Sequence, residues 1–460
     1  MQMDLFRSTF GRPDPILGRM SRPIGIDLFA GAGGLSLGFE QAGFDVVAAV
    51  EIDPVHAAVH AYNFPHCAVV PRSVTDLSGN DIRRAAGIGS KKVDVVFGGA
   101  PCQGFSLIGR RALEDPRNSL VKDFVRIVRE LDADYFVFEN VKGLTVGKHR
   151  KFLDELIQEF KSAGYDVLED WKVLNAYEYG VPQDRQRLFL LGCKRGLKLP
   201  SYPKPITSKP GTINAILPSA PTCADALGDF PDAERFARLK KTDEVEVAKF
   251  GKPSAYAKLM RCETAEDWMY SYKRKWNPSL LTSSMRSNHT EISRQRFAET
   301  SPGEVEPISR FLKLHPNGIS NTLRAGTDSA RGAFTSPRPI HYKRNRCVTV
   351  REMARLHSFP DWFRFNETKW HGARQIGNAV PPLLARAVAS EVIRAIGKRP
   401  SRPRQFIDLG STNLLRLGIG EASSYWGIPN PIAKRDKKSG AKKRRQVDPK
   451  PRGQAPLLSC

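Results

Sequence analysis

The first part of the chain alternates short apolar runs with helical stretches, and this constrains its fold more than any other feature. The first run, IGIDLFA at 24–30, leads through a glycine-rich turn into a helical stretch. The same order repeats, with further apolar runs at 45–51, 92–99, 134–141 and 187–193. Strands that alternate with helices of about 10 to 15 residues indicate a parallel sheet covered by helices. The sequence therefore predicts an α/β fold with a doubly wound, mostly parallel sheet.

The pattern changes after residue 193. From 194 to about 345, prolines, serines and short polar runs replace the alternation, which indicates a separate irregular or mostly β domain. At 381–397 a proline followed by an apolar stripe predicts an amphipathic helix. Beyond Lys398 the chain is rich in Lys, Arg, Gly, Ser and Pro, and we expect its last part to be disordered.

Charge is divided unevenly along the chain. The formal net charge is +24, yet residues 1–192 sum to −2, and the excess comes from 193–345 (+11), 346–400 (+6) and 401–460 (+9). A neutral part joined to a basic part favours catalysis beside a bound polyanion. The alternative is a set of solvated surface lysines.

Composition excludes several classes of protein. No stretch approaches about 18 consecutive apolar residues, and the start of the chain lacks the apolar segment of a signal peptide. We therefore expect a cytoplasmic protein without membrane contact. The seven cysteines never form a CxxC pair, which argues against a disulfide framework or a zinc site, and we expect no metal.

A glycine-rich turn at 27–38 follows the first apolar run and predicts a ligand site. Glycines at the carboxyl end of a strand let a ligand approach the backbone. Glu51 ends the second run at the spacing of a ribose-binding carboxylate, and Asp76, further along the chain, has an oxygen suited to an adenine amino group. Ser36 replaces the third glycine of the dinucleotide fingerprint, which weakens an NAD interpretation. A nucleoside cofactor is favoured over a purely structural turn.

Cys102 is the only one of the seven thiols placed on a loop directly after a parallel strand, within GGAPCQGFS. Active sites of this architecture lie at that edge, so Cys102 is a candidate nucleophile; a buried structural cysteine is the alternative. The following segment carries Arg110, Arg111 and Arg117, which suit phosphate contacts from a mobile lid. A solvated loop is equally consistent with these arginines.

Three charged residues lie beside two later apolar runs, one where a run ends and two where the next begins. Glu139 ends an otherwise apolar run, and burial there would raise its proton affinity, which suits a proton donor. Arg185 and Arg187 occupy alternate positions before the last run and would point to one face of a strand. Planar guanidinium donors suit a carbonyl oxygen or a phosphate, and structural ion pairs are the alternative.

Seven motifs then occur in order: DLFAGAGGLSLGFEQAGF, VEIDPVHAAVHAYNFP, GGAPCQGFS, FVFENVKGL, NAYEYGVPQDRQRLFLLG, RCVTVREMARLHSFPD and QIGNAVPP. Together they resemble the cytosine-C5 DNA methyltransferase family, of the bacterial modification-enzyme type, over 24–192 and about 346–397. The resemblance implies a Rossmann-like domain that uses S-adenosylmethionine. It also implies that the helix after QIGNAVPP packs beside the first motif.

The resemblance assigns roles to the candidate residues. Cys102 would add to C6 of a cytosine flipped out of the duplex, Glu139 would hold N3 and the exocyclic amine, and Arg187 with Arg185 would hold O2 and the loop geometry. Cofactor contacts would come from Phe29, Gly31, Gly33, Gly34, Glu51, Ile52, Asp76, Asn378 and Val380. Departures from the family pattern at Leu77, Ala100 and Ala379 remove no functional side chain.

The same resemblance divides the chain into five parts: an N-terminal extension (1–23), a catalytic and cofactor domain (24–192), a target-recognition domain (193–345), a segment that returns to the catalytic domain (346–400) and a basic, disordered tail (401–460). Within the recognition domain, we expect Thr322, Arg324 and Arg331 to read bases or to clamp the DNA backbone. A pair of polar turns that holds the domain together is the alternative.

The predicted activity is methylation of cytosine C5 within a short duplex sequence. We expect either a member of a restriction-modification system, with a cognate endonuclease that acts separately, or a stand-alone modification enzyme. We also expect a monomer, nucleoid-associated if the source is bacterial. Two rivals remain, a tRNA cytosine-C5 methyltransferase with the same motifs and a catalytically silent DNA-binding module. The long basic segment 193–345 favours DNA over tRNA, and the presence of Cys102 and Glu139 argues against a silent module.

Overall fold

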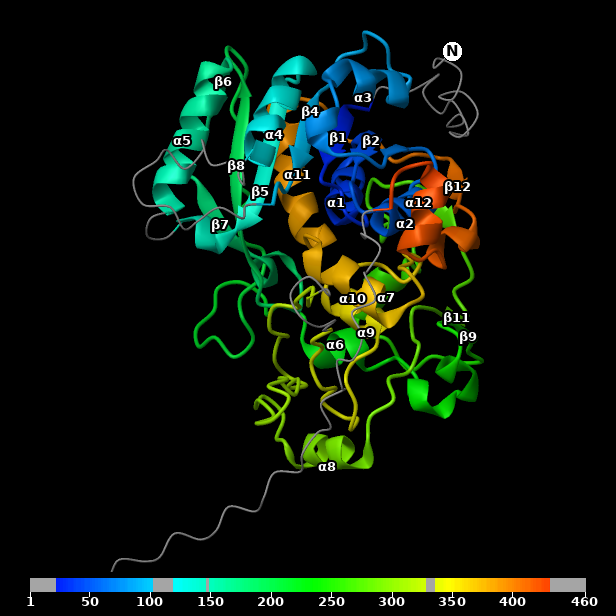
Figure 1. Cartoon of the computed structure of the whole chain (residues 1–460). Helices are drawn as coiled ribbons and strands as arrows, with labels where there is room; N and C mark the ends of the chain where they lie inside the picture. Colours follow the sequence, from blue (N-terminus) through cyan, green and yellow to red (C-terminus); the bar gives the residue numbers. More distant parts are fainter. Residues whose placement is uncertain (1–21, 102–118, 146–148, 328–335, 431–460) are drawn as a thin grey trace, which may run out of the picture.

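The computed structural model describes residues 22–101, 119–145, 149–327 and 336–430. Figure 1 shows a sheet with helices on both faces in the upper part of the view and a region of short elements below it. The strands lie in the order β3-β2-β1-β4-β5-β8-β6, with β7 paired to β8. Their bounds are β1 Ile24–Leu28, β2 Asp45–Val50, β3 Ala68–Val70, β4 Val95–Gly98, β5 Tyr135–Val141, β6 Tyr165–Val167, β7 Lys172–Asn175 and β8 Gln186–Lys194.

Strands β1 to β5 pair with one another in parallel, whereas β8 runs antiparallel to β5, β6 and β7. The predicted doubly wound, mostly parallel α/β sheet is therefore confirmed. The first four residues of β5 are all apolar because both faces of the strand are buried: Tyr135 and Val137 enter the core on one face, and Phe136 and Phe138 enter the core on the other. Strands buried on both faces lose the alternation of polar and apolar residues.

Helices cover both faces of the sheet. One core contains side chains of α3 (Gly79–Ala86), α4 (Ser119–Glu130) and α5 (His149–Ser162), and the other contains side chains of α1 (Gly34–Ala42) and α11 (Pro382–Ile396). α2 (Pro54–Asn63) packs with a third, smaller cluster. Thus α11, more than 300 residues further along the chain, packs on α1.

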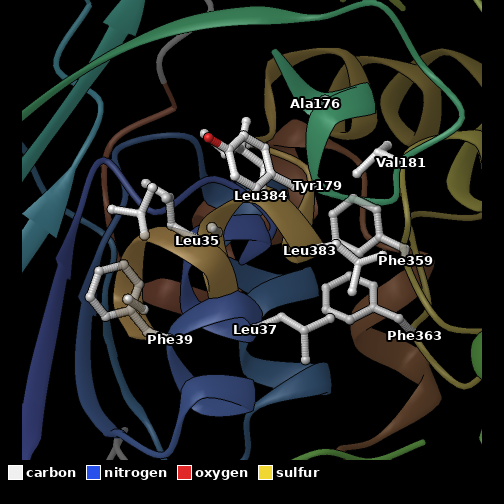
Figure 2. Close-up of a cluster of buried hydrophobic side chains, with 14 of the residues drawn as sticks. Leu35, Leu37, Phe39, Ala176, Tyr179, Val181, Phe359, Phe363, Leu383 and Leu384 are labelled. Carbon is white, nitrogen blue, oxygen red and sulfur yellow. The ribbon is translucent and has the colours of Figure 1, made fainter. Parts of the chain in front are cut away.

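The contact between α1 and α11 is very close. A Cβ atom at Gly38 would lie 2.3 Å from the Ala385 Cβ and 2.7 Å from the Pro382 carbonyl oxygen, so glycine is required there. Figure 2 shows Leu35 and Leu37 of α1 near Leu383 of α11 in the same buried cluster. This packing brings the chain that precedes α11 against the glycine-rich turn.

The region between β8 and α11 contains only short elements. They are α6 Cys223–Leu227, β9 Val245–Glu246, α7 Ala255–Arg261, β10 Lys273–Lys275, β11 Leu280–Leu281, α8 Glu291–Glu299, α9 Val350–Leu356 and α10 Lys369–Asn378, with several 3₁₀ turns. Among the described helices, none is long and apolar enough to cross a membrane.

The structure differs from the predicted disorder over 401–430. Here β12 (Phe406–Asp408) pairs with β10, and α12 (Ile419–Trp426) follows a 3₁₀ turn. Leu414 and Leu415 pack on α2, and the Trp426 indole donates a hydrogen bond of 3.1 Å to the Pro54 carbonyl. These few widely spaced apolar side chains anchor a segment of otherwise polar composition. Residues 431–460 lie outside the described part.

Candidate active site

The site lies at the carboxyl edge of the sheet, where β4 and β5 end side by side. A Cβ atom at Gly99 would lie 2.4 Å from Glu139 Oε2, so a larger residue would displace this carboxylate. The Asn140 side-chain amide donates a 3.0 Å hydrogen bond to the Ala100 carbonyl. These contacts fix the chain up to Pro101. Cys102, Arg110, Arg111 and Arg117 lie outside the described residues.

Glu139 and Arg187 form an ion pair at this edge. The Arg187 Nε lies 2.8 Å from Glu139 Oε1. Phe189 is the direct partner of Glu139 in the ladder, so Arg187 is its diagonal neighbour on the same face of the sheet. Glu139 is only 9% exposed, and burial raises the pKa of its carboxyl group against the opposing charges of Arg187 and Arg185. A carboxyl group with a raised pKa is suited to donate a proton.

Arg185 has a different environment from Arg187. It is fully buried, and it donates to three backbone carbonyls, those of Leu323 (3.0 Å), Gly377 (2.8 Å) and Ala379 (2.8 Å). The predicted contact of Arg185 with the cytosine O2 therefore does not fit its position. Its planar fork instead joins the start of β8 to two distant turns, which agrees with the loop-holding part of the prediction.

A buried histidine completes this junction. The His357 Nε2 lies 3.0 Å from the Ala379 carbonyl oxygen, and the Gln183 side-chain amide lies 3.0 Å from His357 Nδ1. Burial, with the nearby Arg185 charge, holds the pKa of His357 well below its usual range. A neutral ring that donates from Nε2 and accepts at Nδ1 satisfies both contacts. Sequence reasoning missed Gln183 and His357, although both lie within the quoted motifs.

Thr322 belongs to the same junction. Its hydroxyl donates a 2.6 Å hydrogen bond to the Asp184 carbonyl, so the structure supports the alternative of a polar turn pair rather than base reading. The following backbone passes so close to α10 that a Cβ atom at Gly377 would lie 2.3 Å from the Ala325 nitrogen. Arg324 is exposed beside this contact, and Arg331 lies outside the described residues.

The predicted cofactor residues gather around the glycine-rich turn. Glu51 is nearly buried, and its two oxygens accept hydrogen bonds from the backbone N–H groups of Gly31 (2.7 Å) and Asp53 (2.8 Å). Burial raises the pKa of Glu51. Gly31 has φ 57°, and no atom lies within 4 Å of the place where its Cβ would be. A carboxylate fixed beside open backbone is suited to bind the hydroxyl groups of a ribose.

The opposite side of this turn is formed by the chain before α11. A Cβ atom at Gly34 would lie 2.5 Å from the Val380 carbonyl oxygen, so the two predicted cofactor segments are in direct contact. Gly33, with φ 103°, is instead required by the ring of Phe64, 2.5 Å from its would-be Cβ. Phe29 also has a left-handed backbone, with φ 61°.

Three further predicted cofactor residues are exposed to solvent. Ile52, next to Glu51, exposes 63% of its area, and Asp76 and Asn378 are also exposed. An exposed isoleucine beside a fixed carboxylate matches a nucleoside, whose base needs an apolar face and whose ribose needs an acceptor. The residues present therefore fit S-adenosylmethionine.

A buried polar chain beneath the turn was not predicted. The Ser36 hydroxyl donates a 2.6 Å hydrogen bond to Asp27 Oδ2 and lies 3.0 Å from His60 Nε2. Burial raises the pKa of Asp27 to about 8 and lowers the pKa of His60 to about 3. The sequence signal was Ser36 itself, a polar residue where a dinucleotide fingerprint has glycine.

The sequence and the structure of the chain are similar to those of known proteins, which identifies its family. Residues 24–394 match the sequence profile of the family described as C-5 cytosine-specific DNA methylase. The chain belongs to this family. Type II methyltransferase M.XorII of Xanthomonas oryzae is 58% identical over 90% of this chain and 95% of its own, and M1.HphI of Haemophilus parahaemolyticus is 35% identical over 80% and 86%. A putative prophage-encoded DNA modification methyltransferase of E. coli has a similar structure, with a TM-score of 0.65 and 32% identity, over 82% of this chain and all of that one.

The prediction of a DNA cytosine-5 methyltransferase is thus confirmed, and the protein is an enzyme that acts on DNA. Methyltransferases of this family use S-adenosylmethionine as a class. The Type II names of the relatives associate the methyltransferase with restriction-modification systems.

Proposed function

We propose that this methyltransferase transfers the methyl group of S-adenosylmethionine to C5 of a cytosine within a short, specific duplex sequence, through a covalent bond between Cys102 and the base. One observation carries the proposal. The ion pair of Glu139 and Arg187 lies against the 99–101 backbone, and Cys102 is the next residue along the chain.

The cysteine overcomes the low reactivity of cytosine C5. Attack of the Cys102 thiolate on C6 forms a carbon–sulfur bond, and the carboxyl proton of Glu139 moves to N3 as negative charge develops on the ring. The product is an enamine, whose C5 is nucleophilic. After methylation, water takes the C5 proton, and the C5–H electron pair forms the C5–C6 double bond as the carbon–sulfur bond breaks and releases the thiolate. The N3 proton returns to Glu139, which restores the aromatic ring and the starting state of the site. Arg187 holds the Glu139 carboxyl group and donates to O2 of the base.

The cofactor would be held around the glycine-rich turn. Glu51 would accept from the ribose hydroxyls, Ile52 would cover a face of the adenine, and Asp76 would accept from its amino group. Phe29, Gly31, Gly34, Asn378 and Val380 would surround the methionine part. When bound, S-adenosylmethionine supplies an electrophilic methyl group on a sulfonium ion.

The burial of Glu139 supports base flipping. Its carboxyl group is recessed between β4 and β5, with 9% of the residue exposed. A cytosine stacked in a duplex does not present N3, which is occupied in the base pair, to such a group. Rotation of the base out of the helix towards Glu139 brings N3 within hydrogen-bonding reach.

The enzyme would act beside a restriction endonuclease. The Type II relatives support a separate restriction endonuclease that cuts the same sequence when it is unmethylated. We further propose that the enzyme acts as a monomer in the cytoplasm, on the nucleoid. Sedimentation of the full chain with and without a duplex tests the monomer, and a dimer would overturn it.

The central experiment traps the covalent bond. Bisulfite sequencing of plasmid DNA from cells that express the chain first gives the target sequence. A duplex with 5-fluorocytosine at that cytosine should then form a stable adduct, because fluorine does not leave as a proton does. Cys102→Ser should form no adduct while it binds S-adenosylmethionine as wild type does. An adduct with Cys102→Ser, or methylation of tRNA in preference to duplex DNA, would contradict the proposal.

A further inference from the structure

A surface loop at 208–219 exposes apolar side chains to a degree unusual for a folded segment. Ile216 is 99% exposed and Ile213 is 87% exposed, the highest values among the large apolar side chains of the described chain. Every residue from 211 to 219 is exposed. Two almost fully exposed isoleucines, three residues apart on one loop, indicate an interaction site.

The loop is firmly anchored at its base. The Ser208 N–H donates to the Pro218 carbonyl (2.9 Å), and the Ala220 N–H donates back to the Ser208 carbonyl (2.8 Å). The Thr207 N–H donates to the Glu178 carbonyl (3.1 Å), and the Thr207 hydroxyl donates to the Tyr177 carbonyl (2.6 Å). The loop therefore projects from a fixed base, which holds the isoleucines at a defined place.

The base lies at the catalytic edge of the sheet. Tyr177 and Glu178 belong to the 3₁₀ turn Ala176–Tyr179, which begins directly after β7. Leu174, near the end of β7, pairs with Arg187, and Arg187 also pairs with Val141 at the end of β5. β7 and β5 thus end at the same edge, so the loop starts from the edge that holds the Glu139 carboxyl group.

The charge around the loop selects its partner. The stretch 201–224, which leads into and out of the loop, contains two Lys residues, Lys204 and Lys209, and no Asp or Glu. Lys204 and Lys209 are both exposed. A basic stretch without acidic residues favours phosphates, and an apolar tip favours the faces of bases. In other DNA-binding proteins, Ile and Leu side chains wedge between bases. Duplex DNA must reach this edge for its cytosine to meet Glu139.

We propose that loop 208–219 is a DNA-contacting element, in which Ile213 and Ile216 press against bases of the bound duplex and Lys209 contacts a phosphate. The inference depends on DNA as the substrate, and it is independent of the cysteine chemistry proposed above. A binding measurement without methyl transfer therefore tests it separately, and a failure of the adduct experiment would leave it standing.

The test uses the full chain with Ile213→Ser and Ile216→Ser together. Kd is measured by fluorescence anisotropy, over a range of salt, for a labelled duplex that carries the sequence found by bisulfite sequencing. The double variant should bind about tenfold more weakly, because apolar area no longer leaves water on binding. Its slope of log Kd against log salt should be that of wild type, whereas Lys209→Gln should reduce the slope by about 1.

A matched control lies at the opposite edge of the sheet. Leu197 is 38% exposed in the turn after β8, beyond the pair of Cys193 with Tyr135 where β5 begins. Leu197→Ser should change Kd by no more than about twofold. The single variant Ile216→Ser, at a fully exposed position, repeats the test if the double variant unfolds.

Two results would overturn the inference. One is an unchanged Kd in a double variant whose thermal unfolding matches that of wild type. The other is self-association of wild type, seen by sedimentation and abolished in the double variant while Kd stays the same, which would make the loop an interface between copies of the chain.

Discussion

At the scale of single residues, a substitution of Glu139 at the end of β5 can distinguish proton transfer from the positioning of the backbone. Glu139→Gln keeps the size of the side chain and its contact with the 99–101 backbone but removes the proton that N3 needs. We expect methyl transfer to fall by about 10² to 10⁴-fold. The affinity for S-adenosylmethionine should change little. Single-turnover transfer and titration calorimetry measure the two quantities, and a variant that loses both equally would contradict this role.

Arg185 tests the difference between positioning and direct contact with the base. Lysine at this position keeps a positive charge but loses the fork that reaches the carbonyls of Leu323, Gly377 and Ala379. Because the last two carbonyls precede Val380, we expect Arg185→Lys to raise KM for the methyl donor about tenfold, a positioning loss of roughly 1.4 kcal/mol. The rate at saturation should fall much less. A loss of kcat with an unchanged KM would restore the predicted contact with the base.

Asp27 gives a prediction about pH. Burial raises the pKa of Asp27 from 3.8 to about 8, so the folded state binds this proton more tightly than the unfolded state. The stability that the proton contributes is full below the unfolded pKa and is lost as pH rises through the folded pKa. Asp27→Asn stays neutral at every pH and still accepts from Ser36.

The free energy of unfolding of wild type should therefore fall, relative to that of Asp27→Asn, by about 1 kcal/mol per pH unit between pH 5 and pH 8. Urea unfolding at several pH values measures the difference. Parallel pH profiles for the two proteins would show that Asp27 is ionised in the folded state.

At the scale of elements, the packing of α11 on α1 depends on one glycine. Alanine in a helix interior usually stabilises by about 1 kcal/mol relative to glycine. At Gly38, however, the added Cβ would lie 2.3 Å from that of Ala385, and overpacking of this kind costs about 1 to 3 kcal/mol. We therefore expect Gly38→Ala to lower the free energy of unfolding.

The same variant should also weaken binding of S-adenosylmethionine, because α11 begins beside Val380. Gly420 in α12 is the matched control, since its nearest neighbour, the Asn430 side-chain nitrogen, would lie 3.5 Å from an added Cβ. Gly420→Ala should be neutral or stabilising. Thermal unfolding and calorimetry compare the two variants, and a stabilised Gly38→Ala would mean that α11 shifts freely.

The elements also show what the sequence could predict. β5 begins with four apolar residues, and Glu139 ends this run, so both the strand and the carboxylate could be predicted from the sequence. The roles of Arg185 and Thr322 were not visible, because their partners are backbone carbonyls, which leave no trace in side-chain patterns. The order of 401–430 depends on Leu414, Leu415 and Trp426, too few apolar residues to outweigh a polar composition.

At the scale of the whole molecule, the uneven charge along the chain corresponds to different parts of the fold. The part of the chain that is close to neutral contains the sheet and Glu139, and the excess of positive charge follows β8. Within this excess, residues 431–460 carry ten Lys or Arg residues against two Asp. Positive charge that neutralises phosphates releases counterions, so it appears in the salt dependence of binding rather than in sequence preference.

Removal of 431–460 should therefore weaken binding to any duplex and make the slope of log Kd against log salt less steep, by about 0.9 for each phosphate that the tail had neutralised. The target sequence found by bisulfite sequencing should remain the same, because base contacts, rather than phosphate contacts, specify sequence. Anisotropy titrations of the full and shortened chains on matched specific and unrelated duplexes measure the two slopes. Equal slopes would show that these thirty residues touch no phosphate, and a changed target sequence would show that they read bases.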